Sequence, residues 1–198
     1  MTTNNVDVGR RRFLIGATSA VGAVGAAGIA VPFVASWSPS EKAKSAGASV
    51  KFNFSKMEFG ALAVVEWRRE PIYVVRRTKE SLDLLEKIPA EKLKDATSAN
   101  TDQQPEYAHN THRSKNPEFL VIKAVCTHLG CAPKYRPEVG AEGLGKDWTG
   151  GFFCACHGSR FDMAGRVMAG SPAGANLAVP PYKFDGNAII IGEDEGAA

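Results

Sequence analysis

The sequence predicts a mainly β domain preceded by one N-terminal membrane-spanning helix, and three observations support this fold class. Residues 13–37 contain no charged side chain, a run long enough to cross a bilayer as a helix. Short runs rich in β-branched and aromatic residues follow from residue 50 onward. Near the end, Asp185-Gly186 separates two apolar runs, and this dipeptide is typical of a tight hairpin turn.

Composition limits the classes of protein to which the chain can belong. Its 198 residues include 24 Lys plus Arg, 21 Asp plus Glu and four cysteines. This length allows one domain with an appendage, and a composition that is 44% hydrophobic and 23% charged is that of a globular protein. A net charge of +3 provides no broad basic surface for a phosphate backbone, so the composition argues against nucleic-acid binding.

A run of basic residues stands directly before the apolar segment. Arg10-Arg11-Arg12 is followed by Phe13-Leu14, a pattern that resembles a twin-arginine export signal of bacteria. Such signals carry folded proteins across the inner membrane, and basic residues beside a span stay on its cytoplasmic side. We therefore expect residues 1–12 to be cytoplasmic and the domain beyond the span to lie on the periplasmic side.

Residues 13–37 are expected to remain as a single-pass anchor in the lipid of the inner membrane. A cleavable signal has an apolar region of about 7 to 15 residues, and this uncharged run has 25. Cleavage is the alternative, because Val34-Ala35-Ser36 is small enough for a signal peptidase. Residues 38–49 are small or polar, which predicts a flexible linker with an end-to-end distance of roughly 17 to 21 Å.

Residues 50–198 are expected to form the folded domain. Strands are predicted within residues 50–54, 61–67, 71–77 and 118–125, and a hairpin within residues 182–191. One helix is predicted over residues 79–87, where Thr78 is the N-cap and Pro89 ends the helix. The polar segment 96–118 is predicted to be a loop in which His109 and His112 are solvated.

The residues that indicate function lie in two motifs, Cys126-Thr127-His128-Leu129-Gly130-Cys131 and Cys154-Ala155-Cys156-His157-Gly158-Ser159. Each motif contains one histidine and two cysteines, so each can offer one thiolate and one imidazole to a common centre. Two Cys on one iron and two His on the other is the ligand pattern of a Rieske 2Fe-2S centre. Two disulfides in an exported protein, or a structural zinc site, are the alternatives.

Both motifs resemble those of the Rieske iron-sulfur family, in which anchor, linker and β-rich domain follow in the same order. The resemblance implies a Rieske-type antiparallel β-sheet domain with a small subdomain that binds one 2Fe-2S cluster. It implies that Cys126 and Cys154 bind one iron and that His128 and His157 bind the other. It also implies a disulfide between Cys131 and Cys156 that joins the two motifs.

Within this family the chain resembles the Rieske subunits of bacterial ubiquinol-cytochrome c reductases. That resemblance implies a quinol-cytochrome c oxidoreductase of the respiratory chain, and a place in a dimeric complex. The subunit would take an electron from ubiquinol beside a cytochrome b subunit and deliver it to a membrane-anchored c-type cytochrome. The alternatives are the small subunit of an exported molybdenum oxidase similar to arsenite oxidase, or a disulfide or zinc module without redox activity.

The resemblance also assigns roles to residues around the cluster. His157 is expected to contact the quinol and accept its proton, with His128 beside it at an exposed surface. Leu129 and Gly130 are expected to form an apolar docking surface, or else to serve only the geometry of the loop. Ser159 is expected to donate a hydrogen bond to the cluster.

Three positions depart from the family pattern. Phe161 stands where many members have a tyrosine whose hydroxyl reaches a cysteine sulfur, and this departure implies a lower redox potential. Ala155 stands where proline is usual. Gly174 stands where the segment Gly170-Ser171-Pro172-Ala173-Gly174 commonly has a second proline, so we expect less rigid loops around the cluster.

Overall fold

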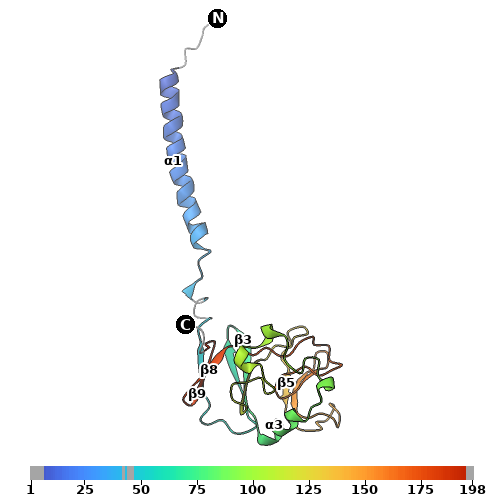
Figure 1. Cartoon of the computed structure of the whole chain (residues 1–198). Coiled ribbons are helices and arrows are strands. Elements are labelled where there is room, and N and C mark those ends of the chain that lie inside the picture. The colour runs from blue at the N-terminus through green and yellow to red at the C-terminus, as the bar shows by residue number, and fades with distance from the viewer. Residues whose placement is uncertain (1–6, 42, 44–46, 195–198) are drawn as a thin grey trace. The chain divides into compact units, whose positions relative to one another are not determined.

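The structure is a computed structural model that describes residues 7–41, 43 and 47–194. It contains two compact units, Met1–Ser45 and Ala46–Ala198, which are drawn in Figure 1. Residues 1–6 of the expected cytoplasmic segment, residues 42 and 44–46 of the expected linker, and residues 195–198 of the expected domain lie outside the described residues.

The first unit contains one long helix, α1 (Val8–Ala35). The carboxylate of Asp7 caps it by accepting the backbone N–H groups of Gly9 at 2.9 Å and Arg10 at 3.1 Å. All described side chains of α1 are exposed, and its most apolar window has a mean hydropathy of 1.8. The helix is therefore long and apolar enough to cross a membrane. It begins five residues before the expected span, so the three arginines belong to its first turns.

The second unit is built from three antiparallel sheets of three strands each, which confirms the mainly β fold class. The first sheet has the order β1 (Val50–Asn53), β9 (Ala188–Ile191) and β8 (Tyr182–Asp185). The second has the order β2 (Leu62–Trp67), β3 (Glu70–Arg76) and β4 (Phe119–Lys123). The third has the order β5 (Lys134–Arg136), β6 (Gly151–Cys154) and β7 (Ser159–Phe161).

The first two sheets contain the strands and the hairpin that the sequence predicts. The β8–β9 hairpin pairs Asp185 with Ala188 across Gly186, whose φ of 56° is in the left-handed region that such a turn requires. The third sheet was not among the predictions. Its strands have three or four residues each, and this is too short for an alternating pattern to be recognised.

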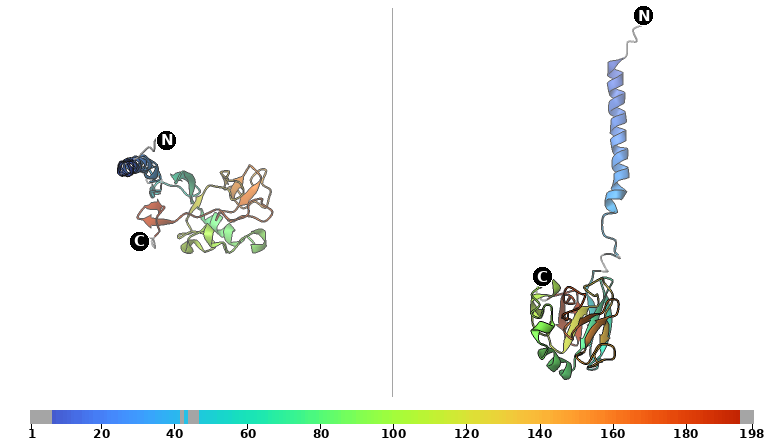
Figure 2. Two further views of the ribbon diagram at one scale, coloured as in Figure 1. Left: turned by 90° about the horizontal axis from the view of Figure 1, so that it is seen from above. Right: turned by 90° about the vertical axis from the view of Figure 1, so that its right-hand side faces the viewer.

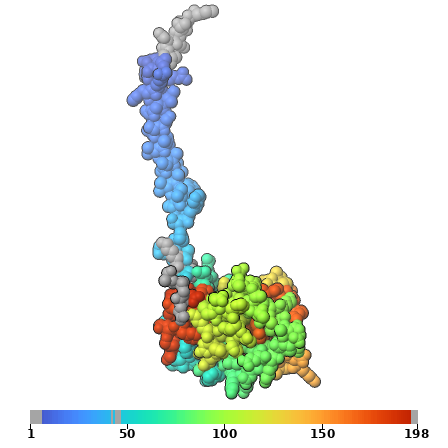
Figure 3. Space-filling view, viewed as in Figure 1, coloured from blue at the N-terminus to red at the C-terminus, as the bar shows by residue number. Residues whose placement is uncertain are grey.

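The helical segments of this second unit lie together on one side of its strands (Figure 2). The helix α3 (Lys79–Glu86) begins at Thr78, whose hydroxyl accepts the N–H of Ser81 at 3.2 Å, as the sequence predicts for the N-cap. Short 3₁₀ helices follow at η1 (Ala90–Lys92), η2 (Thr101–Gln103) and η3 (Glu106–Ala108). Residues around 100–115 form much of the face of this unit that is turned to the viewer in Figure 3.

The segment 96–118 is held more firmly than a solvated loop. Arg113 is fully buried, and its guanidinium donates to the carbonyls of Leu177 at 2.7 Å and Ala164 at 3.2 Å. Burial lowers the pKa of Arg113 to about 10, so the side chain stays protonated at neutral pH. It thereby fixes this segment to the backbone that follows β7, a role that composition alone does not reveal.

The two histidines of this segment differ in exposure. His109 is exposed, as predicted. The prediction for His112 is wrong, because only 21% of its side chain is exposed. Its carbonyl accepts a hydrogen bond at 2.8 Å from the buried Arg77, and this bond draws the residue against the domain. Burial, followed by the charge of Arg77, lowers the pKa of His112.

One continuous hydrophobic core connects the three sheets. Its centre consists of fully buried side chains from β3, β4, β6, β7 and the hairpin: Ile72, Val74, Leu120, Ile122, Phe152, Phe161, Tyr182 and Ile189. Two tyrosine hydroxyls tie the third sheet to the rest: Tyr73 donates to the carbonyl of Pro133 at 3.0 Å, and Tyr135 donates to that of Gly60 at 3.1 Å. The third sheet is therefore a small subdomain on a rigid base.

Candidate functional site

The two Cys/His motifs form similar turns at the small subdomain. In the first, the N–H of Gly130 donates to the carbonyl of Cys126 at 2.9 Å; in the second, the N–H of Gly158 donates to that of Cys154 at 2.9 Å. Both glycines have φ near 80°, a conformation that residues with a side chain rarely adopt. The second motif directly joins β6 to β7, so the core strands set its position.

The four cysteines divide into two pairs. Cys131 and Cys156 are joined by a disulfide across a sequence separation of 25, as the resemblance implies. Cys126 and Cys154 are free, and they are only 3% and 2% exposed. The sulfur of Cys154 lies within 4.8 Å of both disulfide sulfurs, but sulfurs in a disulfide are not thiolates and cannot complete a metal site.

The free thiols lie next to each other in a setting that favours metal binding. Burial raises the pKa of Cys154, and the neighbouring thiol of Cys126 raises it further. The N–H groups of Cys156 and His157 act in the opposite direction, because they donate hydrogen bonds to the Cys154 sulfur. A bound cation would supply the charge that stabilises both thiolates in this buried position.

The two histidines of the motifs meet at the surface. Their rings are perpendicular, with centroids 4.7 Å apart. His157 is exposed and His128 is half-buried. The Nδ1 atom of His128 is buried and has no hydrogen-bond partner among the described residues. Leaving a buried ring nitrogen without a partner is costly, so this atom fits the role of a metal ligand.

Ser159 lies at the start of β7 and is fully buried. Its Oγ accepts the N–H of Ala173 at 3.0 Å. No acceptor for its own hydroxyl hydrogen is present among the residues that the structure describes, so this hydrogen is available to a group bound between the motifs. Thr127 connects the first motif to the same neighbouring segment, because its hydroxyl donates to the carbonyl of Ala175 at 2.6 Å. The sequence of the motifs does not predict this hydrogen bond of Thr127.

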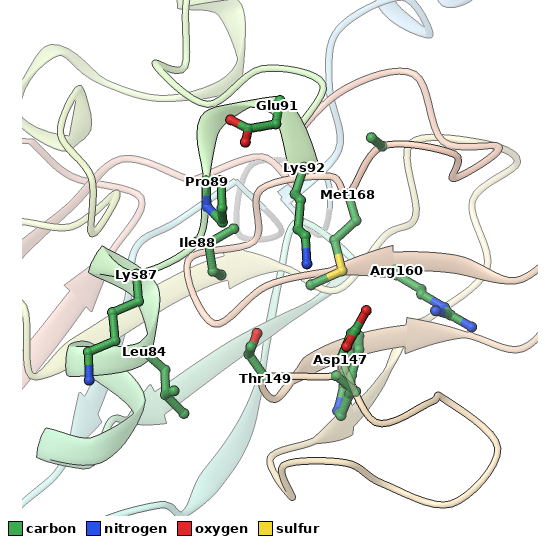
Figure 4. Close-up of a pocket in the computed structure, with 12 residues that line it drawn as sticks. Leu84, Lys87, Ile88, Pro89, Glu91, Lys92, Asp147, Thr149, Arg160 and Met168 are labelled. Carbon is green, nitrogen blue, oxygen red and sulfur yellow. The ribbon is translucent and has the colours of Figure 1, made fainter.

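The histidine pair lines neither of two cavities that the described residues form. A cavity of about 400 Å³ lies between the α3–η1 region and the segment before β6, and Leu84, Ile88, Thr149 and Met168 are among its lining residues (Figure 4). None of the described residues of either motif lines it. Beside the histidines, Leu129 is 70% exposed. An exposed apolar side chain therefore stands next to His128 in the first motif.

Comparisons with known proteins identify the family of the chain. A family model described as the Rieske [2Fe-2S] domain matches residues 89–182. Another, described as the ubiquinol-cytochrome c reductase Fe-S subunit TAT signal, matches residues 1–40. The chain is 51% identical to the ubiquinol-cytochrome c reductase iron-sulfur subunit of Allochromatium vinosum, over 100% of this chain and 95% of that protein. The chain belongs to the Rieske iron-sulfur subunits of ubiquinol-cytochrome c reductase.

Two further relatives extend the comparison. The iron-sulfur subunit of Blastochloris viridis is 40% identical over 96% of this chain and 97% of its own length. Among solved structures, a chain of a hyperthermophilic respiratory Complex III has a TM-score of 0.50 and 25% identity, and the match covers 90% of this chain and 98% of that one.

Membership of this family decides between the interpretations of the cysteines. The chain is an iron-sulfur subunit with a Rieske 2Fe-2S cluster, and it belongs to an oxidoreductase complex of the respiratory chain. A zinc module and a set of two disulfides are thereby excluded. The two free buried thiols, the unpartnered Nδ1 of His128 and the exposed His157 form a donor set that fits this cluster.

Replacing Phe161 with tyrosine is expected to raise the midpoint potential of the cluster. Phe161 is fully buried in β7 two residues after Ser159, so an added hydroxyl there would need an acceptor, and the family pattern provides a cysteine sulfur. A hydrogen bond to a charged acceptor contributes about 1.5 kcal/mol, which corresponds to roughly 60 mV for one electron. Redox titration of Phe161→Tyr measures this shift, with Phe153→Tyr on β6 as the control. An unchanged or lower potential would contradict it.

Proposed function

We propose that Cys126 and Cys154 bind one iron of the cluster and that His128 and His157 bind the other. The burial and mutual contact of the two free thiols support the first assignment. The perpendicular arrangement of the two rings and the unpartnered Nδ1 of His128 support the second. Ser159 donates its free hydroxyl hydrogen to the cluster.

The subunit accepts electrons from ubiquinol at the histidine surface. When bound, the cluster supplies a one-electron acceptor whose potential is raised by its neutral imidazole ligands. His157 is the exposed histidine, so its ring nitrogen that does not bind iron accepts the proton of the quinol hydroxyl. His128 supports the ring of His157 edge to face, and Leu129 provides apolar contact with the partner.

A partner completes the quinol site, because His157 is exposed at the surface of the described domain. A cytochrome b subunit provides the other wall of this site, and the domain then delivers the electron to a membrane-anchored c-type cytochrome. The relative in Schizosaccharomyces pombe, which is 37% identical, carries the name of a cytochrome b-c1 complex subunit, and this supports the proposal over a molybdenum oxidase. The family resemblance also implies a dimeric complex, and we place the subunit in one.

The domain lies on the periplasmic side of the bacterial inner membrane, and α1 is its retained anchor. The match of residues 1–40 to the TAT signal of this family supports export, and the apolar, exposed α1 supports a membrane span. Arg10, Arg11 and Arg12 in the first turns of the helix favour a cytoplasmic N-terminus.

The exposed histidine pair beside Leu129 is the observation that carries this function, and an acidic substitution tests it. Leu129→Asp is expected to lower quinol-dependent reduction of cytochrome c about tenfold. A charge on the docking surface is expected to weaken the free energy of binding to the partner by about 1.4 kcal/mol. The cluster spectrum is expected to stay intact, because Leu129 is not a ligand. Val64→Asp is the matched control, since Val64 is similarly exposed at 61% but lies on β2. Equal turnover of the two variants would contradict the docking role.

Delivery to a second partner requires the domain to move on its linker. Replacing residues 45–49 with a rigid proline-rich stretch is expected to slow turnover several-fold while the cluster spectrum stays unchanged, because proline restricts the backbone. Residues 45 and 46 lie outside the described residues, and the expectation rests on composition. A glycine-serine replacement of equal length is the control. Turnover that is the same with both linkers would rule out a mobile domain.

A further inference from the structure

The segment Gly170–Gly174 lies against Ser159. Two serine side chains hold it there, one from β7 and one from the segment. The N–H of Ala173 donates to the Oγ of Ser159 at 3.0 Å. The Oγ of Ser171 accepts the N–H of Arg160 at 3.0 Å. The segment has a glycine at each end and only one proline, so its backbone gains little rigidity from its own composition. Its position must therefore be fixed by contacts from elsewhere.

Lys94 provides such a contact from outside both motifs. Its Nζ donates to the carbonyl of Ser171 at 2.5 Å and to that of Ala173 at 2.8 Å. Its backbone N–H donates to the carbonyl of Val167 at 3.0 Å, so the lysine is anchored beside the stretch of chain that leads into the segment. Hydrogen bonds from an ammonium group are shorter and stronger than those between neutral groups.

The two carbonyls that Lys94 binds belong to particular peptide groups. The peptide group between Pro172 and Ala173 carries the N–H that donates to Ser159, and the two carbonyls belong to the peptide groups directly before and after it. With both neighbouring peptides fixed, that N–H stays directed at one lone pair of the Ser159 hydroxyl. A hydroxyl has a single hydrogen, which must then point away from the donor that occupies its lone pair.

We propose that Lys94 is a positioning residue for the cluster, acting through Ala173 and Ser159. It holds the Ala173 N–H on Ser159 Oγ and so directs the Ser159 hydroxyl hydrogen toward the cluster. A hydrogen bond donated to the cluster stabilises its more negative, reduced state, so Lys94 raises the potential without touching the cluster. The inference rests on the proposed ligand set and on the proposed role of Ser159.

The neighbouring Lys92 allows the effect of positioning to be distinguished from the effect of removing a positive charge. Both lysines are exposed and lie two residues apart, and replacing either one with methionine removes one positive charge. Lys92 lines the cavity of Figure 4, and its side chain has no hydrogen bond or ion pair among the described residues. Lys92→Met is therefore the matched control for Lys94→Met.

The potential of the cluster is the first measurement, in detergent-solubilised membranes that contain the full chain. Lys94→Met is expected to lower the stability of the reduced cluster, relative to the oxidised cluster, about threefold. At 59 mV per tenfold for one electron, this is a fall of roughly 30 mV in the midpoint potential. Lys92→Met and Lys94→Arg are expected to keep the wild-type potential, the latter because arginine retains both charge and donors. In a Ser159→Ala background, Lys94→Met is expected to cause no further fall. An equal fall in that background, or with Lys92→Met, would show a charge effect and overturn the proposal.

Hydrogen exchange of the peptide covering residues 168–176 is the second measurement, and it does not depend on the redox state. Amides in this stretch are expected to exchange faster in Lys94→Met than in the wild type or in Lys92→Met, because the segment opens locally more often. Unchanged exchange would overturn the positioning role. A wild-type chain without a mixed Cys/His cluster spectrum would instead refute the proposed ligand set, so the two failures are distinguishable.

Discussion

Cys154→Ala is expected to abolish cluster binding, with iron per chain falling by more than about 100-fold. Loss of groups that merely support a metal ligand already costs about 10- to 100-fold in affinity, and Cys154 is proposed as one of only two thiolate ligands. The methyl group that remains cannot bind iron. The domain is expected to stay folded, because the disulfide is unchanged and alanine leaves the other buried side chains of the core in place.

Iron analysis together with electron paramagnetic resonance of the dithionite-reduced full chain measures this loss. Ala155→Ser is the control, because Ala155 is the exposed neighbour of Cys154 in the same turn and has no proposed contact with the cluster. Circular dichroism of both variants verifies the fold. A Cys154→Ala chain that retains stoichiometric iron and the wild-type spectrum would refute the ligand assignment.

Replacing Cys131 and Cys156 together with serine is expected to lower the free energy of unfolding by about 3.5 kcal/mol. The disulfide closes a loop across a sequence separation of 25, and the loss of this constraint releases chain entropy in the unfolded state. Each cysteine belongs to a different motif, so the two motifs also lose their covalent connection. The cluster is therefore expected to be released at a lower temperature than in the wild type.

The temperature at which the cluster absorbance disappears, measured on the full chain in mild detergent, reports this effect. Met163→Leu provides a control for a buried substitution in the core that leaves the disulfide in place, because these two side chains are similar in volume. A double-serine variant that loses its cluster at the wild-type temperature would show that the disulfide does not stabilise the site.

Local sequence patterns predicted the elements that have a strong local signal. The pattern of residues 71–77 predicted β3, because β-branched and aromatic residues follow Pro71. The dipeptide Asp185-Gly186 predicted the β8–β9 turn. The strands of the third sheet gave no such signal. Gly151 shows why: its φ is 148°, and an added Cβ would clash with the backbone carbonyl of Phe161, so tertiary packing rather than propensity forms β6.

The candidate site was predictable where its chemistry is concentrated in sequence. The two motifs contain the thiols, imidazoles and disulfide cysteines within short runs, and the family resemblance supplied the pairing. Lys94 and Arg113 act on the site or its support through distant backbone carbonyls: that of Leu177 lies 64 residues from Arg113, and that of Ala173 lies 79 residues from Lys94. A carbonyl is present at every residue, so the sequence carries no mark of which lysine or arginine binds which one.

Pulsed electron paramagnetic resonance of the reduced full chain, labelled with ¹⁵N-histidine, tests the central claim most directly. The chain is proposed to hold its cluster by two cysteines and two histidines, and this predicts magnetic coupling of the cluster to two ¹⁵N nuclei. The exposed His109 serves as an internal reference, since His109→Gln is expected to leave both couplings unchanged. A spectrum without nitrogen coupling, as for a cluster held by thiolates alone, would contradict the account.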